Sequence, residues 1–318
     1  MNRPKVSVCV PTYNYGRFLP EAIDSILGQS FDDFELIIID DCSQDDTREV
    51  LLRYAARDSR VIARVNERNK GMVANWNACL QESRGTYIKF VFGDDFLYSP
   101  DALRKMVDTL DGDPSVSLVG SARNLVYEQS YRSSSLVTFP ENSIISGAEV
   151  INRCLKEEQN LVGEPTAVMF RREQAMRGFD VRYRQIVDME MWFHLLEERR
   201  FAYITEPLVS FRVHDSQQTA KNIQNMVFLD DYMMLFQEYL PKPYIDLKAA
   251  QKRRIMFNMF YMRYKMTRKD PQQRQLVKEK IRDLYGNGRF YWEMTLYKLN
   301  FLRKLRNRLR RKILRAYP

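Results

Sequence analysis

Short apolar runs, several of them continuous, alternate with amphipathic stretches through the first 120 residues of the chain. Several runs are rich in Val and Ile, which is typical of strands covered on both faces. The runs lie at residues 6–10, 34–39, 61–65, 87–92 and 116–120. Apolar residues at helical spacing fill the gaps, near residues 18–29, 46–57, 72–83 and 100–110. This alternation predicts an α/β fold with a mostly parallel, doubly wound sheet.

The pattern changes further along the chain. A helix-like stretch near 188–199 has strand-like runs on both sides of it, and beyond Pro241 and Pro243 the spacing is helical throughout. The additional strand-like runs lie at 166–170, 202–204 and 208–213. We therefore predict a first domain over residues 1–240, with halves of about 1–120 and 121–240, and an all-helical region over residues 241–318.

Charge divides the chain at the same place. The whole sequence has a net charge of +9 at pH 7. Residues 1–241 hold 27 Lys and Arg against 36 Asp and Glu, a net charge of −9. Residues 242–318 hold 23 against 5, a net charge of +18. An acidic body thus carries a basic C-terminal region, and we expect the two parts to have different partners.

Composition excludes several protein classes. No apolar run approaches the ~20 residues that span a bilayer, and the apolar run near the N-terminus is too short for a signal peptide, so we expect a cytoplasmic chain. The cysteines are scattered, without a CxxC pair, which indicates reduced thiols rather than disulfides or a zinc site. They are Cys9, Cys42, Cys79 and Cys154. With two histidines in the chain, a metal site must depend on carboxylates, which favours Mg²⁺ or Mn²⁺.

Polar clusters follow three of the predicted strands. "PTYN" (11–14) follows the first strand, "DDCSQDDT" (40–47) the second, and Asp94 with Asp95 the fourth. Ligands of open parallel sheets bind at the carboxyl ends of the strands, so we expect these clusters to share one crevice. Neither GxGxxG nor GxxxxGK[ST] occurs, which excludes a glycine-rich phosphate cradle.

Two interpretations of the paired carboxylates stay open at this point. Asp45 or Asp46 could cap the following helix, and Asp94 with Asp95 could form another loop and cap. Alternatively, a divalent cation between the carboxylates and a ligand's phosphates would remove the repulsion between adjacent anions.

The sequence resembles the family 2 glycosyltransferases of GT-A fold. The resemblance covers roughly residues 4–220 and rests on five motifs in order. They are "VSVCVPTYNYGRFLPEAIDSILGQSFDDFELIIIDDCSQDDT", "NKGMVANWNACL", "YIKFVFGDD", "VDMEMWFHLL" and "FRVHDSQQT". The resemblance implies a metal-dependent enzyme of hexosyltransferase type. It would move a sugar with inversion from a nucleotide-diphosphate donor, UDP-sugar favoured, to a hydroxyl of a glycan or polyisoprenoid-linked saccharide, as in surface polysaccharide synthesis.

The resemblance also implies roles on the donor side, in about residues 1–120. Pro11 and Tyr13 would line the nucleoside pocket, and Asp41 would accept a hydrogen bond from the base. Lys70 would approach the base or the diphosphate. Asp94 would hold the ribose side, and Asp95 would bind the Mn²⁺ or Mg²⁺ ion that spans the diphosphate. His214, with Gln217, matches a motif that closes over the diphosphate and metal.

The acceptor side, in about residues 121–240, would carry the general base. The resemblance gives this role to Asp188, with Glu190 in reserve, whereas spacing alone favours a helix N-cap for Asp188. Trp192 would line the acceptor pocket or be packed in the core. Glu164 and Thr166 would meet sugar hydroxyls.

Two positions depart from the family pattern and keep other functions open. Phe92 stands where a further Asp is often found, and Val187 where a Glu often precedes the base. The alternatives are a non-catalytic module that binds sugar nucleotides or glycans, and a membrane-associated scaffold.

The tail over residues 298–318 has nine Lys and Arg and no acidic residue, with leucines at helical spacing. This pattern indicates a helix on an anionic membrane surface, and so a peripheral protein on the inner face of the plasma membrane. The same apolar stripe could instead pack on a neighbouring helix or a second subunit, as in an oligomer. We expect no nucleic-acid binding, because the body is acidic and the basic stretch of the tail has no aromatic residues interleaved among its charges for base stacking.

Overall fold

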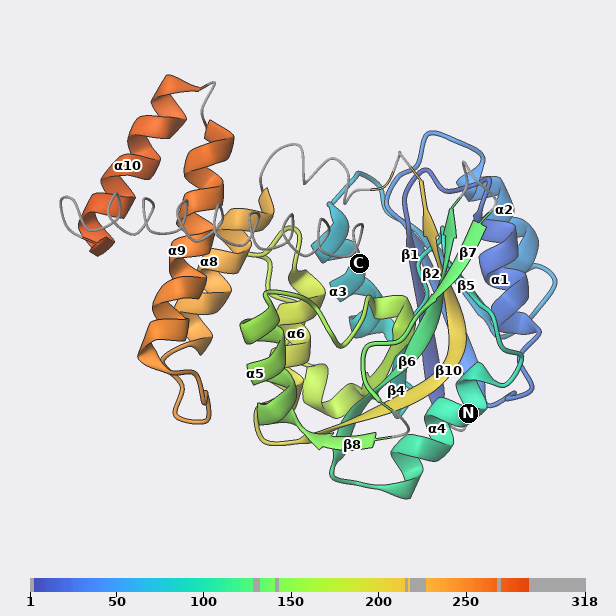
Figure 1. Cartoon of the computed structure of the whole chain (residues 1–318). Coiled ribbons are helices and arrows are strands. Elements are labelled where there is room, and N and C mark those ends of the chain that lie inside the picture. The colour runs from blue at the N-terminus through green and yellow to red at the C-terminus, as the bar shows by residue number, and fades with distance from the viewer. Residues whose placement is uncertain are drawn as a thin grey trace, which may run out of the picture. The chain divides into compact units, whose positions relative to one another are not determined.

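A computed structural model describes residues 3–127, 132–140, 143–214, 217, 227–267 and 270–285 (Figure 1). The chain divides into two compact units. The first comprises Met1–Asp231 and Pro241–Asp246, and the second comprises Tyr232–Leu240 and the chain from Leu247 onwards. All candidate site residues belong to the first unit.

The first 112 residues alternate strands and helices as the apolar pattern predicted. The elements are β1 (Val6–Thr12), α1 (Leu19–Leu27), β2 (Phe34–Asp40), α2 (Thr47–Ala55), β3 (Val61–Val65), α3 (Met72–Glu82), β4 (Tyr87–Phe90), β5 (Phe96–Leu97) and α4 (Ala102–Gly112). Each of the four predicted strands and four predicted helices of this segment is therefore present, with the two-residue β5 in addition.

The rest of the first unit combines two long strands, β6 and β10, with several short elements. It contains β6 (Val116–Tyr127), β7 (Arg132–Leu136), β8 (Ser143–Ser146), α5 (Gly147–Glu157), η1 (Pro165–Ala167), β9 (Val168–Arg171), η2 (Arg172–Ala175), α6 (Val187–Leu196) and β10 (Arg200–Val213). The remaining described helices are α8 (Val227–Tyr239), α9 (Ala249–Met266) and α10 (Pro271–Tyr285). The tail at 298–318 lies outside the described residues.

The strands form one mixed sheet in the order β3-β2-β1-β4-β9-β6-β10-β5. The segment β3-β2-β1-β4 is parallel throughout. Strand β9 then runs antiparallel between β4 and β6, whereas β6 and β10 are parallel to each other. The α/β fold is confirmed, and the parallel arrangement is regular in the first four strands. Because β9 is antiparallel to β4, the segment before β9 returns to the edge where β4 ends.

The core explains why the first two strands are buried at every position and mostly apolar. Figure 1 shows α1 and α2 on one side of β1 and β2, with α3 on the other. Val6, Val8 and Val10 of β1 belong to the core cluster with α1, α2 and α4. Cys9, which points the other way, contacts the Cys79 carbonyl of α3. Alternate residues thus meet different helices, and both faces of the strand exclude water.

Two features of the second half differ from the prediction. Residues 202–204 and 208–213 belong to one strand, β10, whose pairing with β6 is irregular around Ile204–Pro207 and Pro207–Val209. The polar "TEP" interruption is therefore accommodated by irregular pairing within one strand. Helix α5 had no counterpart in the prediction, although its cap is regular: the Ser146 Oγ accepts a hydrogen bond from the Glu149 N–H at 3.2 Å.

In the described part of the chain, no helix is long and apolar enough to cross a membrane. Cys9, Cys42, Cys79 and Cys154 are all free thiols.

Candidate functional site

The loops that follow β1 and β2 are tied together at the carboxyl edge of the sheet. The Asn14 N–H donates to the Ser43 Oγ at 2.7 Å, and the Gln44 N–H donates to the Asn14 Oδ1 at 2.8 Å. Asn14 has φ +56°, in the left-handed region that Asn tolerates better than most residues. Asp45 accepts hydrogen bonds from Thr47, in the first turn of α2. The N-cap position of α2 is Asp46, which has no side-chain cap, so neither Asp45 nor Asp46 is a regular side-chain cap; Asp45 instead closes a local turn onto Thr47.

Asp41 organises the loop that carries Lys70. Its side chain is 2% exposed and accepts hydrogen bonds from the backbone N–H groups of Lys70 and Gly71, both at 2.8 Å, and from the Asn66 Nδ2 at 2.9 Å. Gly71 has φ +88°, which glycine adopts without a Cβ penalty. The Asp41 carboxylate thus fixes the backbone on which the exposed Lys70 side chain stands. Nearby, Pro11 is buried in β1, and Tyr13 is exposed beyond the end of that strand.

Asp94 contacts the histidine of the distant "FRVHDSQQT" motif. The His214 Nε2 lies 3.1 Å from the Asp94 Oδ2, and both side chains are buried. The His214 ring packs on Phe18, with ring centroids 4.9 Å apart. Burial and the neighbouring Asp94 raise the pKa of Tyr15, which therefore stays a neutral phenol beside the carboxylate. The structure therefore joins the two predicted motifs directly.

Asp95 accepts hydrogen bonds from two segments that come much later in the sequence. Its Oδ2 accepts a hydrogen bond from the Thr166 Oγ1 at 2.6 Å, and its Oδ1 accepts one from the Arg212 N–H at 3.0 Å. Burial and the adjacent Asp94 raise the pKa of Asp95 well above its usual value. The ionised pair is thus a state that a bound cation would stabilise.

A lysine lies in the core close to these carboxylates. Lys89 of β4 has no exposed surface, and its Nζ donates to the backbone carbonyls of Thr166 and Val168. Burial lowers the pKa of Lys89 to about 7, and the charge of Asp95 opposes this shift. Sequence analysis missed Lys89, although a lysine inside the apolar run "YIKFVF" is itself an unusual signal.

Phe92 is a packing residue at the position where the family pattern often has a further Asp. Its ring lies against Trp76, with centroids 5.0 Å apart. The Phe92 N–H donates to the Thr166 Oγ1 at 3.2 Å. The hydroxyl of Thr166, which was expected to meet an acceptor, is thus engaged with Phe92 and Asp95 inside the protein.

Asp188 is the second residue of α6 rather than its cap. The N-cap position is Ile186, without a side-chain cap, so the simple N-cap interpretation of Asp188 is wrong. Instead the Asp231 Oδ2 accepts hydrogen bonds from the N–H groups just before the helix, at 2.8 Å from Arg184 and 2.6 Å from Gln185. Asp188 accepts a hydrogen bond from the Asn160 Nδ2 at 2.9 Å. Burial raises the pKa of Asp188 to about 7.

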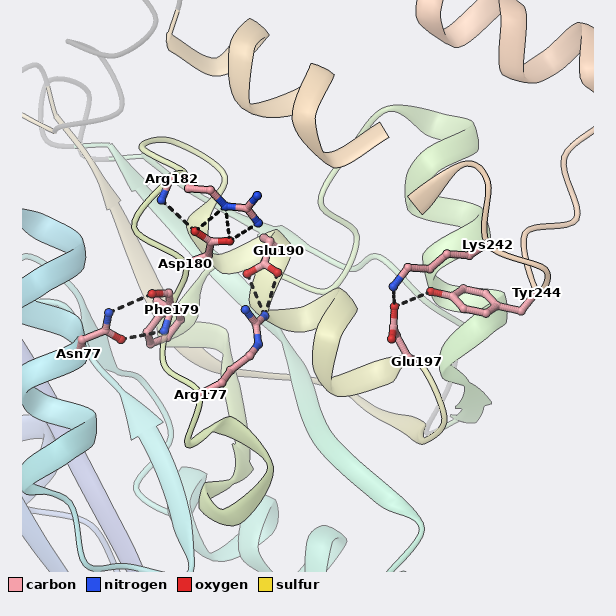
Figure 2. A network of polar contacts seen from close by, with 9 residues as sticks. All are labelled: Asn77, Arg177, Phe179, Asp180, Arg182, Glu190, Glu197, Lys242 and Tyr244. Carbon is pink, nitrogen blue, oxygen red and sulfur yellow. Dashed lines mark hydrogen bonds and ion pairs between the residues drawn. The ribbon is translucent and has the colours of Figure 1, made fainter. Parts of the chain in front are cut away.

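Glu190 lies on the same helix but has a different environment. It is 2% exposed and forms a two-pronged ion pair with Arg177, at 2.8 and 2.9 Å (Figure 2). Its two oxygens are therefore committed to a guanidinium. Figure 2 also shows Glu197, the residue after α6, which forms an ion pair with Lys242 and accepts a hydrogen bond from the Tyr244 hydroxyl.

The other acceptor-side residues are placed as follows. Trp192 is fully buried against Phe170, and its Nε1 donates to the Gly163 carbonyl at 2.9 Å, so the structure supports its packing role. Glu164 is partly exposed and pairs with the buried Arg123. Glu164 therefore stays a candidate for contact with an acceptor.

The donor atoms near Asp94 fit a hard or borderline cation in their chemistry. They are two carboxylates and one imidazole, which suit Mn²⁺ or Mg²⁺. No three His, Cys, Asp or Glu side chains converge on one point within the described ranges, so these residues form no complete protein cage there. A cation at this place would take its remaining ligands from a bound diphosphate and water.

Comparison with known proteins extends the resemblance. Residues 7–179, more than half of the chain, match the family described as Glycosyl transferase family 2. The putative teichuronic acid biosynthesis glycosyltransferase TuaG of Bacillus subtilis is 29% identical over 231 residues, covering 66% of this chain and 80% of TuaG.

Solved structures show the same fold. TarS 1–349 of S. aureus, in complex with UDP-GlcNAc, aligns with a TM-score of 0.62 at 18% identity, covering 84% of this chain and 74% of that one. The mannosyltransferase PcManGT of Pyrobaculum calidifontis, in complex with GDP-Man and Mn²⁺, aligns with a TM-score of 0.55 at 17% identity, covering 95% and 81%. The predicted GT-A fold is confirmed, and the chain belongs to glycosyltransferase family 2.

Proposed function

We propose that the chain transfers a sugar, with inversion, from a UDP-sugar to a hydroxyl of a glycan or lipid-linked saccharide. The observation that carries the proposal is the buried contact between Asp94 and His214 beside Asp95. Adjacent carboxylates that exclude water need a positive partner, and a diphosphate with its cation supplies one.

On the donor side, Asp94, Asp95 and His214 would hold Mn²⁺ or Mg²⁺. When bound, such a cation neutralises charge on the leaving nucleoside diphosphate. Asp41 fixes the Lys70 backbone, which leaves the exposed Lys70 side chain able to approach the base or diphosphate. Pro11 and Tyr13, at the carboxyl end of β1, would line the nucleoside pocket at the same edge of the sheet.

On the acceptor side, Asp188 acts as the general base. A base works best when its pKa lies near the working pH, and burial brings the pKa of Asp188 to about 7. Its ionised carboxylate takes the proton of the acceptor hydroxyl as that oxygen attacks the anomeric carbon. Glu190 is unsuited to the same task because both of its carboxylate oxygens accept hydrogen bonds from Arg177.

The donor and acceptor classes are supported by the relatives. TarS and PcManGT are described with a UDP-sugar and a GDP-sugar, and TuaG is named for a polysaccharide. A binding module or scaffold has no need of a partly buried carboxylate that titrates near neutrality. We also propose that the basic tail at 298–318, which lies outside the described residues, attaches the protein to the inner face of the plasma membrane.

Thermal unfolding of the full chain tests the donor site directly. UDP, GDP and dTDP are each added with Mn²⁺ and again with EDTA. A nucleotide at a hundred times its dissociation constant raises the free energy of unfolding by about 2.7 kcal/mol. We expect UDP with Mn²⁺ to stabilise and UDP with EDTA to have little effect. Equal stabilisation in EDTA would remove the metal from the proposal, and no effect of any nucleotide would remove the donor site.

A further inference from the structure

We propose that Asn160 positions the general base: its side-chain amide holds the Oδ2 of Asp188, so that the Oδ1 takes the proton of the acceptor hydroxyl. This inference rests on the proposed role of Asp188. Asn160 lies in the loop between α5 and η1, 28 residues before Asp188, and belongs to none of the sequence motifs.

The orientation of the Asn160 amide is fixed by the backbone of Gly163. The Asn160 Oδ1 accepts a hydrogen bond from the Gly163 N–H at 3.1 Å, and the Asn160 Nδ2 donates to the Gly163 carbonyl at 3.1 Å. The second hydrogen of the same Nδ2 is donated to the Asp188 Oδ2 at 2.9 Å. A rotated amide would oppose its oxygen to a carbonyl and a carboxylate, so the donor to Asp188 is unambiguous.

The loop itself is held on both sides. At the end of α5, Glu158 has φ +57°, and the Gln159 N–H donates to the Cys154 carbonyl at 3.1 Å. On the α6 side, the Trp192 Nε1 donates to the Gly163 carbonyl at 2.9 Å. The loop that carries Asn160 is therefore fixed against both α5 and α6, and the Asn160 amide is in place before any substrate binds.

The hydrogen bond from the neutral Asn160 amide has to be weighed against the charged groups near Asp188. Glu164 faces Asp188 and raises its pKa, hydrogen bonds from the backbone N–H groups of Met189 and Asp188 lower that pKa, and Arg123 pairs with Glu164. Glu190, also on α6, is paired with Arg177. A cation bound to Asp188 would hold its pKa low and weaken it as a base, whereas an amide orients the carboxylate and still allows it to accept a proton.

The proton and bond changes are simple. The acceptor hydroxyl gives its proton to the Asp188 Oδ1, and its oxygen forms a bond to the anomeric carbon. The bond between that carbon and the diphosphate oxygen breaks, and the nucleoside diphosphate leaves with the electron pair.

Removing the amide tests the inference. In the full-length Asn160→Ala variant, the carboxyl ¹³C signal of Asp188 is followed against pH by NMR. The signal is assigned by its absence in Asp188→Asn. A hydrogen bond to the ionised form lowers a pKa, so its removal shifts the titration midpoint of Asp188 upward by about one pH unit.

Steady-state kinetics provide a second measurement. The donor substrate is the nucleotide sugar whose nucleotide stabilises the protein against thermal unfolding. With Asn160→Ala, we expect the acidic limb of kcat to move upward with the NMR midpoint, and the KM for the donor to stay unchanged. A loss of kcat of about tenfold or more should persist above pH 9, because the Asp188 carboxylate is ionised there but is no longer oriented by Asn160.

A second variant and a matched control separate positioning from folding. Asn160→Asp keeps the side-chain shape and places a negative charge against the Asp188 Oδ2, so the midpoint should rise further than in Asn160→Ala. Asn77 is the control, because its amide brackets the Phe179 backbone in the same way, at 2.7 and 2.9 Å, without a carboxylate (Figure 2). Asn77→Ala should lower the melting temperature and leave both the midpoint and the limb unchanged.

The failures are distinguishable. An unchanged midpoint and limb in both Asn160 variants, with Asp188→Asn inactive, would overturn the role of Asn160 and keep that of Asp188. An Asp188→Asn variant that still transfers sugar would overturn both.

Discussion

The two sides of the candidate site each contain buried carboxylates, but they are compensated differently. On the donor side, Asp95 has a raised pKa because it is buried beside Asp94; the buried Lys89 lies near Asp95, and the buried His214 contacts Asp94. On the acceptor side, Asp188 has a pKa raised to about 7 by burial, and its side-chain partner among the described residues is the neutral Asn160.

The difference teaches how one fold separates two tasks of the same functional group. A carboxylate that must hold a cation gains from a second carboxylate nearby, because the repulsion disappears when the cation binds. A carboxylate that must exchange a proton gains from neutral support, because a fixed charge would move its pKa away from the working pH. The predictions below test this contrast, beginning with the largest effect.

Asp188→Asn should remove transfer almost completely while leaving donor binding intact. General-base catalysis contributes about 10²- to 10⁴-fold to a rate, so kcat should fall by about 10³-fold. The measurement is steady-state kinetics together with the thermal shift produced by UDP and Mn²⁺. A variant that loses the thermal shift as well would mean that Asp188 belongs to the donor side.

Asp95→Asn should remove the metal-dependent part of donor binding. The amide keeps one oxygen for Thr166 or Arg212 and cannot carry the charge that a cation needs. The stabilisation by UDP with Mn²⁺, about 2.7 kcal/mol at a hundred times the dissociation constant, should fall to the level seen with EDTA. A full thermal shift in this variant would contradict the donor-side argument.

Glu190→Gln should affect stability and spare chemistry, in contrast to Asp188→Asn two residues earlier. Loss of the ion pair leaves the partly exposed Arg177 without its carboxylate and should cost about 2 kcal/mol of unfolding free energy. Chemical denaturation measures the cost, and kcat per folded molecule should stay near the wild-type value. A loss of kcat on the scale of Asp188→Asn would make Glu190 the base.

Lys89→Met should change how stability depends on pH. The folded pKa of Lys89, about 7, lies below its ordinary value of 10.5, so the unfolded chain binds more protons between these limits. The cost of burying Lys89 is therefore full below about pH 7 and declines as pH rises. Relative to Lys89→Met, the wild type should gain about 2 kcal/mol of unfolding free energy between pH 7 and 9, measured by urea titration. A constant difference across that range would show that Lys89 does not titrate there.

The sequence was sufficient for the parallel half of the sheet because its signal is local. Runs such as "FELIII" are apolar except for Glu35 and are buried at every position, which follows directly from helices on both faces. The half of the sheet that contains β9, β6 and β10 has shorter or interrupted runs. Strand β10 was predicted as two strands because Glu206 and Pro207 break its apolar pattern, and irregular pairing that keeps a strand continuous leaves no such pattern.

For the site, motifs located the carboxylates and missed what holds them. Asp94, Asp95 and Asp188 stand in recognisable contexts, whereas Asn160 is one asparagine in a loop, a position where asparagine is common for local reasons. The pairing of Glu190 with Arg177 likewise joins residues whose spacing follows neither helix nor strand periodicity. Such contacts depend on the three-dimensional path of loops, which composition and periodicity do not encode.

The long reach of the hydrogen bonds on Asp95 has a consequence for the protein during its synthesis. Thr166 follows Asp95 by 71 residues and Arg212 by 117, and His214 follows Asp94 by 120. A ribosome that has released β1 to β4 has exposed a nascent sheet whose two carboxylates still lack these partners. Completion of the donor pocket must wait for the end of β10 to emerge, so a chain truncated before residue 212 can form the first strands and never the finished pocket.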